Sequence, residues 1–224
     1  MIAEFGNTPL PQTPPPPDDL VCVVDDDEAV RCCLERLFRS ARLSVATFAS
    51  ASDYLGRKPN PGPVCLVTDL WMPGLNGLEL QRLVADRDEQ VVFLTGHGDV
   101  PMCVKAMKAG AVDFLTKPVD DEILLSAVSR ALDRAREIAK SRAKRTTARA
   151  MIESLTPREL EVMRCVVDGL LNKQIAAELG IAEKTVKIHR GRVMKKTHSV
   201  SVPDLMRLAL IADDAKKPVR SQFA

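Results

Sequence analysis

The sequence of 224 residues lacks the features that mark membrane and secreted proteins. No apolar run approaches the roughly 18 consecutive residues that a membrane-spanning helix requires. The N-terminus lacks the charged, apolar and small-residue regions of a secretory signal peptide, and residues 1–18 are rich in proline instead. We therefore expect a cytoplasmic protein that begins with a disordered leader and has no membrane partner.

The six cysteines show no spacing that is typical of a metal site or of a disulfide framework. They stand among apolar neighbours, which favours reduced thiols in cores or on helix faces. These residues are Cys22, Cys32, Cys33, Cys65, Cys103 and Cys165.

The composition nevertheless permits packed cores, because 46% of the residues are apolar. Collagen-like, mucin-like and largely disordered chains are thereby excluded, and the length suggests two small domains. Residues 1–133 carry 12 basic and 20 acidic side chains, residues 134–150 carry 7 and 1, and residues 151–224 carry 13 and 9. The acidic part suits a divalent cation, and the basic part suits the phosphate backbone of a nucleic acid.

Short apolar runs alternate with helical patterns over the first 133 residues. This alternation predicts βαβ units, a parallel sheet covered on both faces, and a flavodoxin-like, doubly wound α/β domain. The expected strands are Leu20–Val24, Val45–Phe48, Val64–Thr68, Val91–Thr95 and Ala111–Leu115. The expected helices are Glu28–Ser40, Ala51–Gly56, Gly77–Asp86 and Val100–Ala109, followed by one that starts near Asp120.

Polar residues gather where these predicted strands end. The first strand runs into three consecutive aspartates, Asp25 to Asp27, and the third runs into Asp69. Thr95 ends the fourth strand, and Lys117 follows the fifth. In a doubly wound sheet these ends meet at one edge, and a hard cation such as Mg²⁺ would neutralise the clustered carboxylates.

The motifs in this region resemble the receiver domain of two-component response regulators. They are VCVVDDD from Val21, DLWMPGLNG from Asp69, LTGHG from Leu94 and FLTKP from Phe114. The resemblance implies that Asp69 accepts a phosphoryl group from the phosphohistidine of a sensor histidine kinase. It also implies that Thr95 and Lys117 contact that group, and that Asp25, Asp26, Asp69 and the backbone carbonyl of Trp71 bind Mg²⁺.

Three further features accompany the same resemblance. Phe114 occupies the position of an aromatic switch residue that follows Thr95, although a plain core residue of the strand is an equal alternative. Lys117–Pro118 is expected to be a cis peptide. Gly74 and Gly77 fit a tight loop that brings the backbone close to the acceptor.

A second domain is expected after a basic segment at residues 135–153, which we interpret as a helical extension that becomes a mobile linker. Thr156, Pro157 and Glu159 form a helix start with an N-cap, a first-turn proline and a capping box. Four helices follow, and Gly180 supplies the turn of a helix-turn-helix. They are expected at Pro157–Asp168, Asn172–Leu179, Glu183–Lys196 and Pro203–Ala212.

The motifs LTPRE, NKQIA and TVKIH in this second region resemble the LuxR-type DNA-binding domain. The resemblance implies that the helix from Glu183 enters the major groove, where base contacts specify sequence and phosphate contacts fix position. It places Lys187, Ile188 and Gly191 nearest the bases. Contacts to phosphate or sugar are expected from Lys173, Thr185, His189 and Arg192. Arg190 is expected to contribute to specificity with Lys187 and DNA shape, and Lys184 is a further DNA-binding residue of the same helix.

Together the two resemblances identify a response regulator of the NarL/FixJ family, which is a transcription factor rather than an enzyme. We expect a receiver domain at 19–134, the linker at 135–153, the DNA-binding domain at 154–214 and a tail at 215–224. The expected partners are a sensor histidine kinase, double-stranded promoter DNA, RNA polymerase and, after phosphorylation, a second copy of the chain.

Two other functions are weaker interpretations of the same residues. A Mg²⁺-dependent phosphatase of the haloacid dehalogenase type is suggested by the Asp-x-Asp at Asp25, but Ala29 stands where such a motif has Thr or Val. An FMN-binding module would need a phosphate loop after the first strand, and the carboxylates there would repel a phosphate.

Overall fold

The computed structural model describes residues 19–96 and 98–212, and the chain divides into two compact units. The first unit is Met1–Ala139 and the second is Lys140–Ala224. The expected leader, residues 1–18, and the expected tail, residues 215–224, lie outside the described residues.

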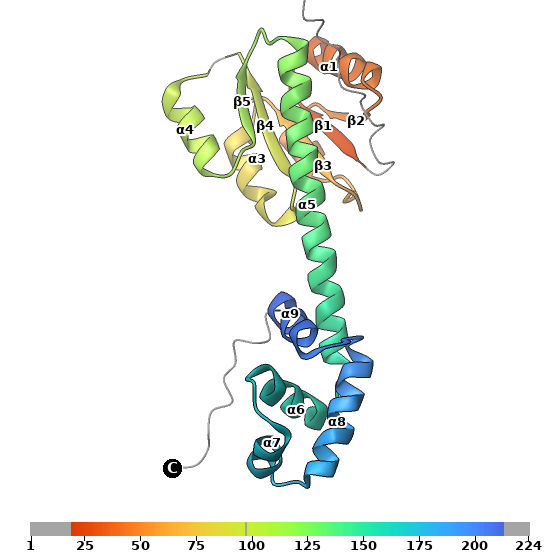
Figure 1. Cartoon of the computed structure of the whole chain (residues 1–224). Coiled ribbons are helices and arrows are strands. Elements are labelled where there is room, and N and C mark those ends of the chain that lie inside the picture. Colours follow the sequence, from red (N-terminus) through yellow and green to blue (C-terminus); the bar gives the residue numbers. More distant parts are fainter. Residues whose placement is uncertain (1–18, 97, 213–224) are drawn as a thin grey trace, which may run out of the picture. The chain divides into compact units, whose positions relative to one another are not determined.

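A five-stranded parallel sheet forms the centre of the first unit (Figure 1). Its strands are β1 (Leu20–Val24), β2 (Ser44–Phe48), β3 (Val64–Thr68), β4 (Gln90–Thr95) and β5 (Asp113–Thr116). They lie in the order β2-β1-β3-β4-β5, which is that of a flavodoxin-like, doubly wound fold. The predicted fold of this region is confirmed, and the carboxyl ends of the strands share one edge.

Helices cover both faces of this sheet, because successive side chains of a strand point to opposite faces. Val21 and Val23 pack in one cluster with residues of α1 and α5, whereas Cys22 and Val24 pack in a second cluster with residues of α2, α3 and α4. These helices are α1 (Glu28–Ser40), α2 (Ala51–Leu55), α3 (Gly77–Leu83), α4 (Val100–Lys108) and α5 (Asp121–Glu153), and a 3₁₀-helix, η1 (Ala85–Arg87), follows α3.

The last strand and two helices differ most from the predicted bounds, and several other elements differ by one residue. β5 begins at Asp113, two residues later than expected, because Ala111 is buried outside the sheet and Val112 N donates a single bond to Val91 O at 2.7 Å. The predicted helix from Gly77 ends at Leu83 and gives way to η1. α5 runs unbroken to Glu153, so residues 135–153 are helical throughout.

The second unit contains α6 (Pro157–Val167), α7 (Asn172–Leu179), α8 (Glu183–Lys196) and α9 (Val202–Ala212), together with the end of α5. Their buried apolar side chains form one cluster, to which α8 contributes Val186 and Val193. The predicted capping box is present: Thr156 Oγ1 accepts from Glu159 N at 3.3 Å, and Thr156 N donates to Glu159 at 2.9 Å. Gly180 ends α7 with a φ of 64°, as its turn role requires.

Two expectations from composition can be compared with the structure. Among residues 19–96 and 98–212, none of the helices has the length and hydropathy that a bilayer crossing needs. All six cysteines are free thiols, and Cys22, Cys65 and Cys165 are buried, whereas Cys32 and Cys33 are exposed on α1.

Candidate functional site

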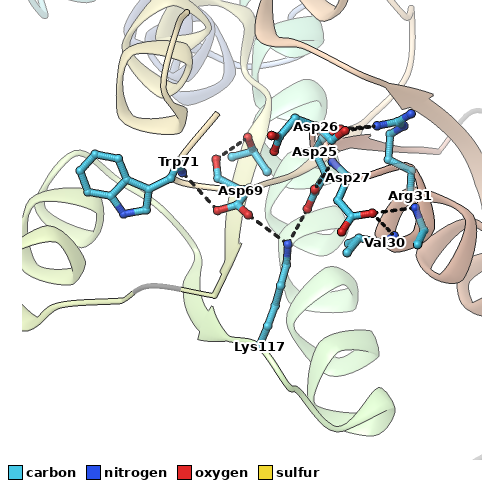
Figure 2. Close-up of polar contacts among 10 residues, drawn as sticks. Asp25, Asp26, Asp27, Val30, Arg31, Asp69, Trp71 and Lys117 are labelled. Carbon is cyan, nitrogen blue, oxygen red and sulfur yellow. Dashed lines mark hydrogen bonds and ion pairs between the residues drawn. The ribbon is translucent and has the colours of Figure 1, made fainter. Parts of the chain in front are cut away.

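Four predicted site residues lie at the edge where the parallel strands end. Asp25 follows β1, Asp69 follows β3, Thr95 is the last residue of β4, and Lys117 follows β5. Figure 2 shows the side chains of Asp25, Asp69 and Lys117 pointing toward one another. The fold therefore brings together residues that are as many as 92 positions apart in the chain.

The ammonium group of Lys117 joins the two carboxylates. Its Nζ donates to Asp25 Oδ2 at 2.6 Å and to Asp69 Oδ2 at 3.0 Å. Burial alone lowers the pKa of Lys117, but the hydrogen bonds and the negative charges of Asp25 and Asp69 outweigh it and raise the pKa above its usual value. Lys117 is therefore a fixed positive charge at the pH of a cell.

The three consecutive aspartates have different partners. Asp25 Oδ1 accepts a hydrogen bond from Asp27 N at 3.0 Å, and Asp27 Oδ1 caps α1 by accepting from Ala29 N at 2.8 Å. The carboxylate of Asp26 is exposed and accepts no hydrogen bond from any residue in 19–96 or 98–212. Asp26 is thus the carboxylate most available to a ligand.

The available ligands fit Mg²⁺ if backbone and water oxygens complete the coordination that the side chains supply. Within the described ranges, no three His, Cys, Asp or Glu side chains gather closely enough to hold a metal ion by themselves. Mg²⁺, however, commonly binds through one or two carboxylates and keeps several waters, and the predicted set includes a backbone carbonyl. Asp25, Asp26 and Asp69 with Lys117 leave two net negative charges, which a divalent cation neutralises.

The loop after β3 is shaped by close backbone contacts. A Cβ atom on Gly77 would lie 2.3 Å from the carbonyl oxygen of Asp69, so only glycine fits there. Gly74 adopts a φ of 80°, which is also a glycine conformation. Trp71 N donates to Asp69 Oδ1 at 3.2 Å, and the Trp71 side chain is 53% exposed. The backbone of Trp71 therefore lies beside the acceptor, whereas its indole points away from Asp69 and contacts solvent (Figure 2).

The predicted switch residues lie on neighbouring strands. Thr95 is buried, and its carbonyl oxygen accepts from Lys117 N at 2.8 Å. The Phe114 ring is half-buried with its centroid 5.8 Å from that of Phe93, and a Cβ atom on Gly98 would lie 2.9 Å from Phe114 Cε1. The predicted cis peptide at Lys117–Pro118 is present. The switch role itself stays a prediction.

In the second unit, α8 presents a basic, solvent-exposed face. Val186 and Val193, seven residues apart, are buried and fix the opposite face against the core. Lys173 on α7 is exposed as well. The exposed residues of α8 at helical spacing are Lys184, Lys187, Ile188, Gly191, Arg192 and Lys195.

Not every predicted DNA-contact residue is equally available. Thr185, His189 and Arg190 are half-buried. Arg190 Nη1 donates to Asn172 Oδ1 at 2.6 Å and so ties α8 to the start of α7. Among the residues that the structure describes, Lys187 makes only a long ion pair with Glu183, at 3.8 Å on the helix surface.

A partly buried ion pair joins α8 to α6. Lys196 Nζ donates to Glu159 Oε2 at 2.6 Å, and the Glu159 side chain is 3% exposed. The hydrogen bond from Lys196, followed by the one from Thr156 N, lowers the pKa of Glu159 to about 2. Sequence reasoning assigned Glu159 to the capping box alone, because nothing in the pattern joins it to a lysine 37 residues away.

Comparison with known families accounts for both units. Residues 21–129 match the family described as the response regulator receiver domain. Residues 153–209 match the family described as bacterial regulatory proteins, luxR family. The order of the two matches along the chain is that of the two units.

Relatives match about four fifths of the chain or more. The chain is 48% identical over 185 residues to Nodulation protein W of Bradyrhizobium diazoefficiens, across 81% of each sequence. It is 43% identical over 187 residues to the transcriptional regulatory protein FixJ of Azorhizobium caulinodans, across 83% of this chain and 89% of that protein. The low-resolution structure of the response regulator StyR superposes with a TM-score of 0.78 at 44% identity, covering 86% of this chain and 98% of that one.

Proposed function

Because this chain belongs to the response regulators that join a receiver domain to a LuxR-type DNA-binding domain, we propose that phosphorylation of Asp69 controls its binding to promoter DNA. Its relatives are transcriptional regulators, so the chain is a transcription factor rather than an enzyme. This membership sets aside the phosphatase and the FMN-binding module. It also implies two partners, a sensor histidine kinase and DNA.

The observation that carries the proposal is the pair of bonds from Lys117 Nζ to Asp25 and Asp69. In the proposed transfer, an Asp69 carboxylate oxygen forms a bond to phosphorus while the bond from phosphorus to the donor imidazole nitrogen breaks. That nitrogen keeps the electron pair. The fixed charge of Lys117 lies where the negative oxygens of the phosphoryl group arrive, and such preorganised charge lowers the barrier.

Magnesium belongs to the same proposal. Asp25, Asp26, Asp69 and the backbone carbonyl of Trp71 would hold it, and it would neutralise charge on the phosphoryl oxygens. Lys117 and Thr95 are then the protein groups that contact the transferred phosphoryl group. Thr95 ends β4, and Phe114 lies in the neighbouring strand β5. When Thr95 shifts toward the phosphoryl group, the ring of Phe114 can therefore change its rotamer to follow it.

Apolar exposure on α4 supports phosphorylation-dependent dimerisation. Val100, Val104 and Met107 follow one another at helical spacing and are 76%, 43% and 42% exposed. β5, which follows α4 in the chain, is an edge strand of the sheet. We propose that this surface, formed by α4 and β5, pairs with the same surface of a second copy once Asp69 is phosphorylated.

DNA recognition is proposed for the exposed face of α8, with Lys187 and Ile188 nearest the bases. Arg192, Lys184 and the neighbouring Lys173 would contact phosphate or sugar. Two such units would bind half-sites about 34 to 36 Å apart, one turn of the double helix. RNA polymerase is the proposed partner of the DNA-bound dimer.

Labelling by a small phosphodonor tests the acceptor. The intact chain should acquire one hydroxylamine-labile phosphoryl group, and Asp69→Asn should acquire none. Asp86→Asn is the matched control, because Asp86 is an exposed aspartate in η1, remote from the strand ends in sequence. Persistent label on Asp69→Asn would place the acceptor elsewhere.

Sedimentation with and without the phosphate mimic beryllofluoride tests dimerisation. The mass should double when the mimic is bound, and Val104→Asp should keep the phosphorylated chain monomeric because it puts a charge in the apolar stripe. Equal masses in the two states would refute the switch.

A further inference from the structure

Arg31 holds the backbone of the acidic loop from the first turns of α1. Its guanidinium Nη1 donates to Asp25 O at 2.7 Å and to Asp26 O at 3.0 Å (Figure 2). Its backbone N donates to Asp27 O at 3.1 Å. One residue therefore bonds the carbonyls of all three consecutive aspartates.

The other bonds of this loop do not fix Asp26. Asp25 is tied to the sheet through its N–H, which donates to Phe48 O at 3.3 Å, and Asp27 is tied to α1 through its cap. Between these two anchors, Asp26 accepts a bond only at its carbonyl oxygen, from Arg31, as far as the described residues show. The direction of the Asp26 carboxylate therefore depends on a backbone that Arg31 holds.

We propose that Arg31 is a positioning residue for the metal site: by clamping the Asp25 and Asp26 carbonyls, it keeps the Asp26 carboxylate aligned with Asp69 for a divalent cation. This inference rests on the proposed Mg²⁺ site. Groups that orient metal ligands from outside the coordination sphere commonly change affinity by about 10- to 100-fold when they are removed. Arg31 makes two such bonds to the backbone of two proposed ligands.

The positive charge of Arg31 and its positioning role should change the Mg²⁺ affinity in opposite directions. A positive charge near a cation site repels the cation, so deleting it should tighten Mg²⁺ binding if charge were its only contribution. Loss of positioning should weaken Mg²⁺ binding, because the Asp26 carboxylate then less often adopts the orientation that binds the ion. Arg31→Ala should therefore weaken Mg²⁺ binding by roughly 10-fold or more, despite the removal of a repelling charge.

The test is a Mg²⁺ titration of the full chain at constant ionic strength, followed by Trp71 fluorescence and by calorimetry. Trp71 is the single tryptophan of the chain, and its backbone N–H donates a hydrogen bond to the Asp69 carboxylate. Arg36→Ala is the matched control, because Arg36 is an exposed arginine of the same helix that makes no bond to the acidic loop. It should leave the Mg²⁺ affinity within about 2-fold, since exposed charges are well screened.

Arg31→Lys is the second variant, in case Arg31→Ala fails to fold by circular dichroism. It keeps the charge but loses the guanidinium geometry, so its Mg²⁺ affinity should fall between those of the intact chain and Arg31→Ala. Equal or tighter binding in Arg31→Ala, or unchanged binding in Arg31→Lys if the alanine variant is unfolded, would overturn the role of Arg31. Absence of Mg²⁺ binding by the intact chain in calorimetry would instead sink the metal site of the proposed function, which is a distinguishable outcome.

Discussion

The two candidate sites of this protein hold their charges in opposite ways. At the edge of the sheet, Lys117 and Asp69 have named partners at bonding distance and little exposure, with side chains 24% and 13% exposed. On α8, Lys187 is 67% exposed, and its ion pair with Glu183 is long. Transfer of a phosphoryl group needs fixed charges in a preorganised geometry. Binding of a nucleic acid instead needs exposed basic side chains that can extend to its phosphates and bases.

This contrast also predicts how each site responds to a substitution. A change in the fixed cluster should remove a function outright, because each group orients the next. A change on the exposed face should remove one contact and leave the others in place.

The largest effect is expected at the acidic cluster. Asp26→Ala should abolish the change in Trp71 fluorescence on adding Mg²⁺, because Asp26 is the carboxylate that no described residue engages. The intact chain, titrated alongside, supplies the reference signal. A full fluorescence response in Asp26→Ala would contradict the proposal that Mg²⁺ binds at this cluster.

A smaller effect is expected from Lys187→Ala on α8. It should cost about 1 to 3 kcal/mol on the specific DNA site and relax discrimination at one base position, because it removes the proposed base contact. Measurement of affinity for specific and unrelated duplexes at several salt concentrations provides the readout.

Lys173→Ala is the matched variant for that experiment. As a phosphate contact, it should weaken binding to all sequences alike and reduce the salt slope by about one unit. If the two variants have indistinguishable footprints and salt slopes, α8 is a generic basic surface and the groove assignment fails.

The smallest effect is expected from breaking the ion pair between Glu159 and Lys196, which joins α6 and α8. Glu159→Gln should lower the free energy of unfolding at neutral pH by roughly 1 to 2 kcal/mol, because it weakens a charge-assisted bond and a capping box. The pKa of Glu159 falls from 4.5 in the unfolded chain to about 2 in the folded one, so the ionised form stabilises the fold above pH 4.5. That contribution is lost as the pH falls through about 2.

The difference in unfolding free energy between the intact chain and Glu159→Gln should therefore shrink between pH 4.5 and 2. Urea denaturation followed by far-UV circular dichroism measures it. A difference that stays constant over this pH range would mean that the bond with Lys196 does not lower the pKa of Glu159.

The positions of the strand-end residues could be predicted because the signals that mark each element are local. β1 and α1 begin and end at the predicted residues, since Asp27 is an N-cap and the apolar run before it is short and bounded. The residues after each strand could be assigned to one edge because parallel topology puts all carboxyl ends together. The Lys117 bridge between Asp25 and Asp69 follows from that topology.

Features set by tertiary packing could not be predicted in the same way. The bond of Arg190 to Asn172 joins residues 18 positions apart, so an arginine expected on DNA is partly engaged within the unit. The contacts of Arg31 run from a side chain to backbone carbonyls, and these have no sequence signature. α5 persists to Glu153 because Ala, Arg and Lys favour a helix even where apolar periodicity is lost.

The link between the two sites is tested by the affinity of the full chain for its promoter DNA, at one fixed salt concentration, before and after treatment with a small phosphodonor. The intact chain should bind at least about 10-fold more tightly after treatment, because a dimer engages two half-sites at once. Asp69→Asn should show no change. Equal affinity of the intact chain in both states, with Asp69 fully phosphorylated, would contradict control of DNA binding by Asp69.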